Sequence, residues 1–251
     1  MNKQALIIAK MNLANIKVPY FVTGLALGIA MVQSIIYAII AIIYGKAGIQ
    51  MEISIGNYFW LVVLLAAVYI PTRNFRRIVN LGGKRNGFFW GSMISYVLLA
   101  SVGSLANAIF YYTYDKFLIG TGAYVGIGAF LKDSSMFSNK NIVVNLIELF
   151  GWNSHGVFLA IIQQFVFLIL LAAVVHTLSS IQDKWYGWVI DVIIAAFLGL
   201  FIPIASLRPT LLSFINLIVF NSNAFVQIVI CLILAILIYA LNKPILSRKA
   251  I

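Results

Sequence analysis

The chain has 251 residues, of which 63% are hydrophobic and 9% charged, and its formal net charge is +11. This composition excludes an ordinary soluble domain, which is about 45–50% apolar and about 25% charged. The length suits one membrane domain, residues 1–251, with about six helices of about 20 residues each. The basic residues gather at the ends of apolar runs, and no RNA- or DNA-binding motif accompanies them. We therefore expect membrane lipids, and not nucleic acid, around the chain.

Residues 1–17 are predicted to form a helix that lies on the membrane surface. Lys3, Lys10 and Lys17 recur every seven residues, which is close to two helical turns. An apolar arc runs beside this stripe, formed by Ala5, Leu6, Ala9, Leu13 and Ile16. Such a helix would lie in the interface, with its lysines reaching the lipid headgroups. The alternative is a simple extension of the first membrane span.

Three spans are predicted in the first half of the chain, over residues 19–44, 53–70 and 88–112. Gly24 and Gly28 in the first span are four residues apart, a spacing that lets two helix backbones approach closely. The contact could lie within one chain or at the seam of a dimer. Pro71 is predicted to end the second span, because proline lacks the N–H that continues a helix.

Residues 71–87 contain five of the 17 basic residues and no acidic residue. Thr72 can cap a short helix over residues 72–81, and Gly82 can end it in the left-handed conformation. Arg73, Arg76 and Arg77 would share one side of this helix, with Phe75 supplying an apolar contact. The alternative is a positively charged loop that only determines membrane orientation.

The second half of the chain begins with a long polar segment, residues 113–155, which is predicted to be a flexible extracellular loop with an interfacial helix near residues 142–152. Spans follow over residues 157–178, 188–204 and 224–241. Residues 207–223 are too broken to span and are predicted to form a short hairpin that dips into the outer leaflet. Gln163 and Gln164 are polar within the fourth span, where they could bond to other helices or line a path.

The distribution of basic residues predicts the orientation. With six spans, twelve of the 17 Lys and Arg residues fall on the side of the two termini and five on the other side. The positive-inside rule therefore places both termini in the cytoplasm.

The sequence carries no pattern for a catalytic centre. Asp191 lies near a span end, and His176, near the cytoplasmic end of the fourth span, is interpreted as a packing residue more readily than as a proton relay. No zinc-binding or Ser/His/Asp pattern is present, and no P-loop that would bind ATP. We expect no enzyme, no metal and no cofactor in this chain, so any ATP must be hydrolysed by a partner.

The segment from Asn80 to Gly91 resembles the Leu-Gly-x-x-Arg-x-x-Phe-Phe-x-Gly pattern that follows the second span in bacterial permeases of the type-2 ATP-binding-cassette exporter superfamily. The matching residues are Leu81, Gly82, Arg85, Phe88, Phe89 and Gly91. The predicted layout agrees with that family: an all-α fold with an N-terminal interfacial helix, six spans, a cytoplasmic coupling helix between spans two and three, and short outer hairpin helices between spans five and six. The segment 113–155 is longer than compact members of the family need.

The resemblance implies a multi-pass subunit of the bacterial cytoplasmic membrane that forms a homodimer or heterodimer and docks separate nucleotide-binding subunits. Its dimer would form the path for a hydrophobic or amphipathic substrate such as a peptide or drug. Gly24 and Gly28 would lie at the dimer seam, and the coupling residues would be Phe75, Arg76, Arg77, Leu81, Gly82 and Arg85. Two other classes stay open: an ion-coupled secondary transporter or channel, and a non-transporting immunity or sensor protein.

Overall fold

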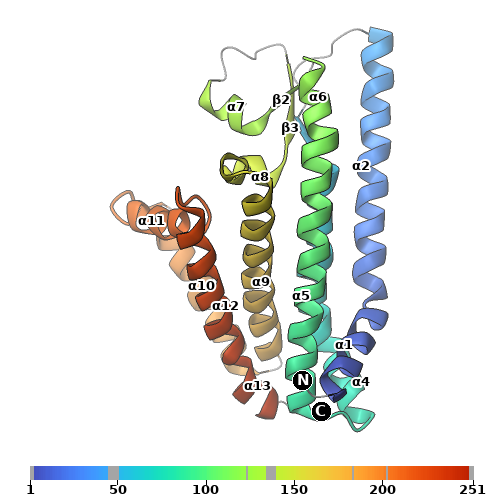
Figure 1. Ribbon diagram of the computed structural model, residues 1–251. Helices are drawn as coiled ribbons and strands as arrows, with labels where there is room; N and C mark the ends of the chain where they lie inside the picture. The colour runs from blue at the N-terminus through green and yellow to red at the C-terminus, as the bar shows by residue number, and fades with distance from the viewer. Residues whose placement is uncertain are drawn as a thin grey trace. The chain divides into compact units, whose positions relative to one another are not determined.

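The computed structural model describes residues 3–44, 51–122, 124–133, 140–182, 184–201 and 203–248 (Figure 1). The chain divides into two compact units. Unit 1 comprises residues 1–16, 63–100 and 166–251, and unit 2 comprises residues 17–62 and 101–165. Lys46 and Lys249, two of the 17 basic residues counted for the orientation, lie outside the described residues.

The chain is mostly helical. In order, the helices are α1 (Lys3–Asn15), α2 (Lys17–Tyr44), α3 (Phe59–Tyr69), α4 (Phe75–Asn80), α5 (Arg85–Phe110), α6 (Lys116–Gly120), α7 (Ile127–Lys132), α8 (Leu146–Leu149), α9 (Val157–Ile181), α10 (Trp185–Phe201), α11 (Arg208–Ile218), α12 (Ala224–Ala240) and α13 (Asn242–Arg248). The strands are β1 (Met51–Ile53), β2 (Tyr124–Gly126) and β3 (Asn141–Val144).

Five helical stretches among the described residues are long and apolar enough to cross a membrane. They are Lys17–Ile36, Ile55–Asn80, Arg85–Gly120, Val157–Ile181 and Ala224–Ser247. This confirms the prediction of a helical membrane protein. Helix α10, where the fifth of six spans was predicted, has 17 residues and a shorter apolar stretch, Gly187–Phe197.

Pro71 does not end the second span, contrary to the prediction. A π-helical turn over Ile70–Asn74 joins α3 to α4. A wider turn accommodates proline, which cannot donate the usual backbone hydrogen bond. The Thr72 hydroxyl donates to the carbonyl of Val68 at 2.7 Å and caps no helix. The helical stretch therefore continues without a break from Ile55 to Asn80.

The predicted end of this helix at Gly82 is confirmed. Gly82 has a φ of +83°, in the left-handed region that glycine adopts without steric cost. Its N–H donates to the carbonyl of Val79, and the N–H of Gly83 donates to that of Ile78, both at 2.9 Å. This is the Schellman arrangement, which satisfies carbonyls left over at a helix C-terminus.

Unit 2 contains a small parallel sheet that the sequence did not predict. The strand order is β1-β3-β2, with Met51 paired to Ile142 and Tyr124 paired to Asn141. Val125, Ile127 and Ile142 form a buried apolar core beside it. The predicted flexible loop over residues 113–155 thus contains two strands and several short helices within its described part.

The last part of unit 1 runs from α9 to α13. Helix α10 leads away from the end at which α9 finishes, and α12 returns toward it (Figure 1). Residues 207–223 contain the single helix α11, and not the helical hairpin that was predicted. The Cys231 thiol of α12 lies 3.5 Å from the carbonyl of Ile218, at the end of α11.

Candidate functional site

The segment that resembles the exporter pattern lies where α1, α4, α5, α12 and α13 of unit 1 meet. Helix α1 packs on the first turns of α5, where Gly91 of α5 lies against Ala5 and Ile8 of α1. A Cβ at Gly91 would lie 2.7 Å from Cγ2 of Ile8 and 2.9 Å from the carbonyl oxygen of Ala5. Glycine at position 91 therefore permits the close approach of α1.

A buried line of amides fixes the same helices. The Asn74 amide donates to Asn12 at 3.2 Å, and the Asn12 amide donates to the Ser92 hydroxyl at 3.4 Å. The buried side of α1 is Ala5, Ile8, Ala9 and Asn12, whereas Leu6, which the sequence placed on the apolar arc, is 54% exposed. The predicted helix exists, but its packed face is rotated toward the small and polar residues, because these fit against α5.

The predicted role of Phe75 in coupling requires an exposed side chain, but Phe75 is buried. Its side chain is 0% exposed, and its ring meets that of Phe88 edge to face with centroids 5.1 Å apart. Ile78, one turn later, is also buried. In this structure Phe75 anchors α4 to unit 1, so it cannot contact a docked subunit.

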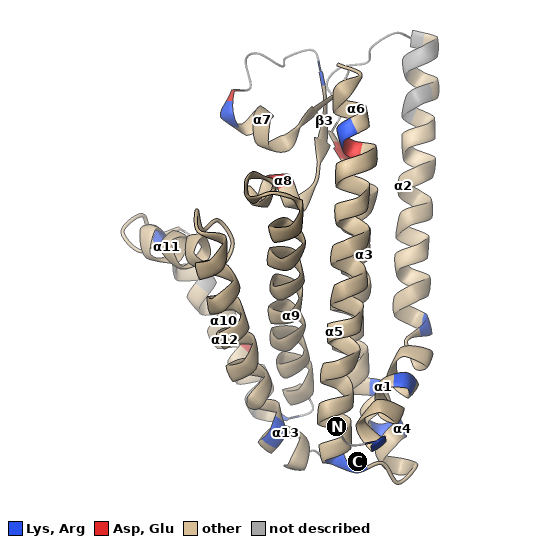
Figure 2. Cartoon of the chain, in the orientation of Figure 1, with Lys and Arg blue, Asp and Glu red and all other residues tan. Residues whose placement is uncertain are grey.

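The opposite side of α4 is exposed and basic. Arg73, Arg76, Arg77 and Leu81 all reach the surface, and Leu81 is 68% exposed. The Arg77 guanidinium donates to the side-chain oxygen of Asn15 at 2.9 Å, which connects α4 to the end of α1. Figure 2 shows Lys and Arg positions on α1, α4 and α13, at the same end of unit 1.

Arg85 faces the C-terminal helix, in contrast to its predicted role in coupling. Its guanidinium donates to the carbonyl of Leu246 at 3.2 Å and to that of Ser247. Carbonyls in the last turn of a helix lack partners within the helix, and a nearby cation is favoured there. Arg85 therefore holds α13 against the start of α5.

Phe89 connects the start of α5 to α12. Its ring lies 4.8 Å from that of Tyr239, whose hydroxyl donates to the Phe89 carbonyl at 2.8 Å. The Tyr96 hydroxyl and Nδ1 of His176 are 2.6 Å apart, and both side chains are buried. His176 thus has a well-packed, hydrogen-bonded position, as expected of a packing histidine.

These contacts divide the residues of the motif into those that pack against neighbouring helices and one that stays exposed. Phe88, Phe89, Arg85 and Gly91 bind α5 to the surrounding helices, and Leu81 remains exposed beside the arginines of α4. The arrangement is a short basic helix fixed firmly on one side and open on the other.

The remaining predicted residues lie elsewhere. Gly24 and Gly28 have no heavy atom within 4 Å of an added Cβ, so their face of α2 is open among the described residues and the dimer seam stays a prediction. Gln163 and Gln164 are buried in α9, and neither lines the cavity between α1 and α5 or the one beside Glu52. Asp191 accepts a 2.5 Å hydrogen bond from Gln182.

Unit 2 contains a buried polar cluster that the sequence did not indicate. The Asn145 amide lies 3.0 Å from the Ser54 hydroxyl, 3.1 Å from the Asn107 side-chain oxygen and 2.8 Å from the Asp115 carboxylate. The Asn145 side-chain oxygen accepts from the N–H of Ile147 and so caps α8. These residues lie up to 91 positions apart, so no local pattern could bring them together.

Glu148 lies against two glycines, Gly126 and Gly128, where a larger residue would meet its side chain. Its carboxylate lies against Gly126, where an added Cβ would overlap both oxygens. The backbone N–H groups of Gly128 and Ala129, at the start of α7, bond to this carboxylate. Burial raises the pKa of Glu148, and this outweighs the opposing effects of Lys116 and of the two amides. The Glu148 carboxylate therefore joins α8 to the start of α7.

Among the described residues, no group of three or more His, Cys, Asp or Glu side chains could hold a metal ion. The chain matches no protein-family model, no curated protein and no solved structure.

Proposed function

We propose that this chain is the membrane subunit of an ATP-driven exporter of the bacterial type-2 ATP-binding-cassette class. The proposal rests on the motif Leu81–Gly91 together with the exposed side of α4. A helix with one side packed and a basic, leucine-bearing side open is suited to docking a separate ATP-hydrolysing subunit. ATP would be bound there, and this chain would carry no catalytic residue.

The contacts of α4 supply a route for coupling. Helix α4 is continuous with α3 through the π turn, so a displacement of α4 acts directly on a membrane span. Phe75 carries the same displacement to α5 through Phe88. Closing two ATP-binding subunits against two copies of this surface would rock the spans and open a path between the two membrane subunits.

We further propose six crossings. Gln4 of α1 lies beside Gly87, and Arg85 bonds to residues of α13, so both terminal helices lie at the same end of α5. Ends on one side of a membrane require an even number of crossings. Helix α10 supplies the sixth: its 17 residues span about 25 Å, short of the about 30 Å hydrocarbon core, and local thinning of the bilayer accommodates the difference.

Reporter fusions test this topology. A reporter placed after Ile251 is expected on the cytoplasmic side, in the bacterial cytoplasmic membrane, because twelve of the 17 basic residues lie on that side. Reporters within residues 132–140 and at Arg208 are expected on the outer side. A reporter at Arg208 on the same side as the C-terminus would show that α10 does not cross.

The partner in the membrane would be a second copy or a sibling subunit. Helix α2 offers the surface, since its stretch Lys17–Ile36 is largely exposed and nothing described lies within 4 Å of an added Cβ at Gly24 or Gly28. The apolar and aromatic character of the spans favours a hydrophobic or amphipathic cargo, such as a peptide or drug.

Leu81→Ala tests docking. A few side chains near the centre of an interface carry most of its binding energy, and Leu81 lies beside the exposed arginines of α4. We expect binding of the ATP-hydrolysing subunit to weaken about tenfold, the effect of about 1.4 kcal/mol, with a matching loss of stimulated ATP hydrolysis. The amount and thermal stability of the protein should not change, because Leu81 makes few contacts of its own.

Leu241→Ala is the matched control. Leu241 is also an exposed leucine of unit 1, at 59%, and it follows α12 at the end where α13 begins. Its substitution should leave docking and ATP hydrolysis at the wild-type level. Equal values for Leu81→Ala and Leu241→Ala would contradict the proposed docking surface and return α4 to a role in membrane orientation alone.

A further inference from the structure

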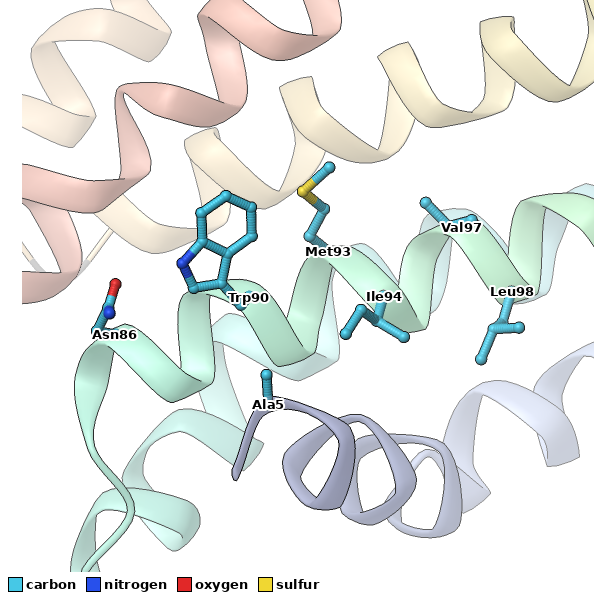
Figure 3. Close-up of a pocket in the computed structure, with 7 residues that line it drawn as sticks. All are labelled: Ala5, Asn86, Trp90, Met93, Ile94, Val97 and Leu98. Carbon is cyan, nitrogen blue, oxygen red and sulfur yellow. The ribbon is translucent and has the colours of Figure 1, made fainter. Parts of the chain in front are cut away.

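Unit 1 has an apolar groove that the proposed function does not use. It is a cavity of about 510 Å³ along α5, with Ala5 of α1 on its other side (Figure 3). Its α5 wall consists of apolar side chains between Trp90 and Leu98, and the polar side chain of Asn86 lies at one end. The volume is within the range of about 300–1,000 Å³ that small-molecule sites occupy.

The length of the groove matches one leaflet of a bilayer. From Asn86 to Leu98 the helix rises about 18 Å, and half of the hydrocarbon core is about 15 Å thick. The groove begins at the start of α5 and runs along the membrane-spanning stretch Arg85–Gly120. Trp90, 47% exposed, lies one turn from the polar end, at the depth where tryptophan side chains collect in membranes.

Two lysines lie close in the chain to residues at the polar end of the groove. Exposed Lys84 precedes Asn86 by two residues, and exposed Lys3 precedes Gln4, whose side chain lies beside Gly87. Arg85, between Lys84 and Asn86 in the chain, donates a hydrogen bond to α13 instead. The sequence has no acidic residue in 1–17 or in 53–114, the segments that build this end. An anionic group there would meet these cations, and neither of the two segments adds a carboxylate that would compete with it.

We propose that this groove binds an anionic phospholipid, with one acyl chain between α1 and α5 and the headgroup phosphate at Lys3 and Lys84. An apolar groove as long as one leaflet, with lysines near its polar end, fits both the acyl chain and the headgroup of such a lipid. The bound chain would fill the space that α1 leaves on α5 and hold α1 in place.

Lipid binding to the full-length protein in mild detergent tests the proposal, with native mass spectrometry as the readout. Phosphatidylglycerol and phosphatidylcholine with identical acyl chains serve as probes. We expect wild-type protein to bind phosphatidylglycerol about tenfold more tightly, because two lysines near an anionic headgroup favour it. The double variant Lys3→Gln/Lys84→Gln should lose this preference and retain the weaker binding of phosphatidylcholine.

The double variant Lys184→Gln/Lys243→Gln is the control, since it removes the same charge from other basic positions of unit 1. It should keep the wild-type preference. Equal loss in both double variants would overturn the proposal, because it would indicate a general effect of net charge. Equal affinity of wild-type protein for the two lipids would also overturn it.

Two further measurements locate the acyl chain. Ile94→Trp fills the groove and should reduce binding of both lipids, with the folded state checked by thermal unfolding. Phosphatidylglycerol brominated on its acyl chains should quench part of the tryptophan fluorescence, and Trp90→Phe should remove that part. Unchanged quenching in Trp90→Phe would place the lipid elsewhere. Loss of a protein dimer, without loss of bound lipid, in Ile94→Trp would assign the groove to a second copy and overturn the proposal.

Discussion

Replacing Phe75 with alanine is expected to lower the free energy of unfolding by about 3–5 kcal/mol, the usual cost of truncating a fully buried phenylalanine. The ring is 0% exposed and packs on Phe88, so its removal leaves a cavity between α4 and α5. Chemical denaturation of the purified protein in detergent measures this change. The loss would loosen the connection between α4 and the spans.

Leu81→Ala provides the comparison for this variant. Leu81 lies six residues away and is exposed, so its truncation should change stability by no more than about 0.5 kcal/mol. The two variants thus separate packing, at Phe75, from docking, at Leu81. A Phe75→Ala protein as stable as wild type, yet defective in binding an ATP-hydrolysing subunit, would return Phe75 to the role of surface anchor.

Replacing Gly91 with alanine is expected to lower the free energy of unfolding by about 1–3 kcal/mol, as overpacking does in a tight core. The added methyl group would overlap Ile8 and approach the backbone of Ala5. Backbone atoms cannot move aside as the end of a flexible side chain can, so α1 must shift. Protease cleavage within α1 should then become faster, which peptide mapping would detect.

Gly199→Ala is the matched control for this substitution. Gly199 also lies within a helix, but nothing described lies within 4 Å of an added Cβ there. Alanine favours a helix over glycine by roughly 0.5–1 kcal/mol, so this variant should be as stable as wild type or slightly more so. Equal losses in both variants would contradict the close contact of α1 and α5.

Local patterns in the sequence predicted the parts of the fold that depend on local chemistry. Long apolar runs identified the membrane helices, and the Gly82–Gly83 pair identified where α4 ends, because few residues other than glycine adopt positive φ. The same local reasoning failed at Pro71. There a π turn over Ile70–Asn74 carries the helix past the proline.

Contacts between distant segments could not be predicted in this way. Arg85 was expected on a docking surface, but its partners lie 161 and 162 residues later. The apolar aromatic side chain of Phe75 suits either an interface or a buried core. Its contact with Phe88, which the sequence could not show, places it in the core. The parallel sheet depends on three strands of three or four residues, too short for a period-two pattern to stand out.

The basic stretch and the motif predict where in the chain the candidate site lies, and its location stays a prediction. The structure changes which of the predicted residues reach its surface. The sequence could not show which of its residues face inward, because that depends on α1 and α13 folding back onto the start of α5. Of the six predicted coupling residues, Arg76, Arg77 and Leu81 lie at the exposed side of α4, whereas Phe75 and Arg85 contact unit 1 itself.

The most direct test of the central claim is affinity purification of the tagged full-length protein from its native membrane, followed by measurement of ATP hydrolysis. We predict that a separate P-loop subunit copurifies with wild-type protein and that Leu81→Ala releases it while Leu241→Ala retains it. Hydrolysis in the wild-type complex should rise when the complex is placed in lipid vesicles. Purification of the intact, folded chain with no ATP-hydrolysing partner would contradict the account.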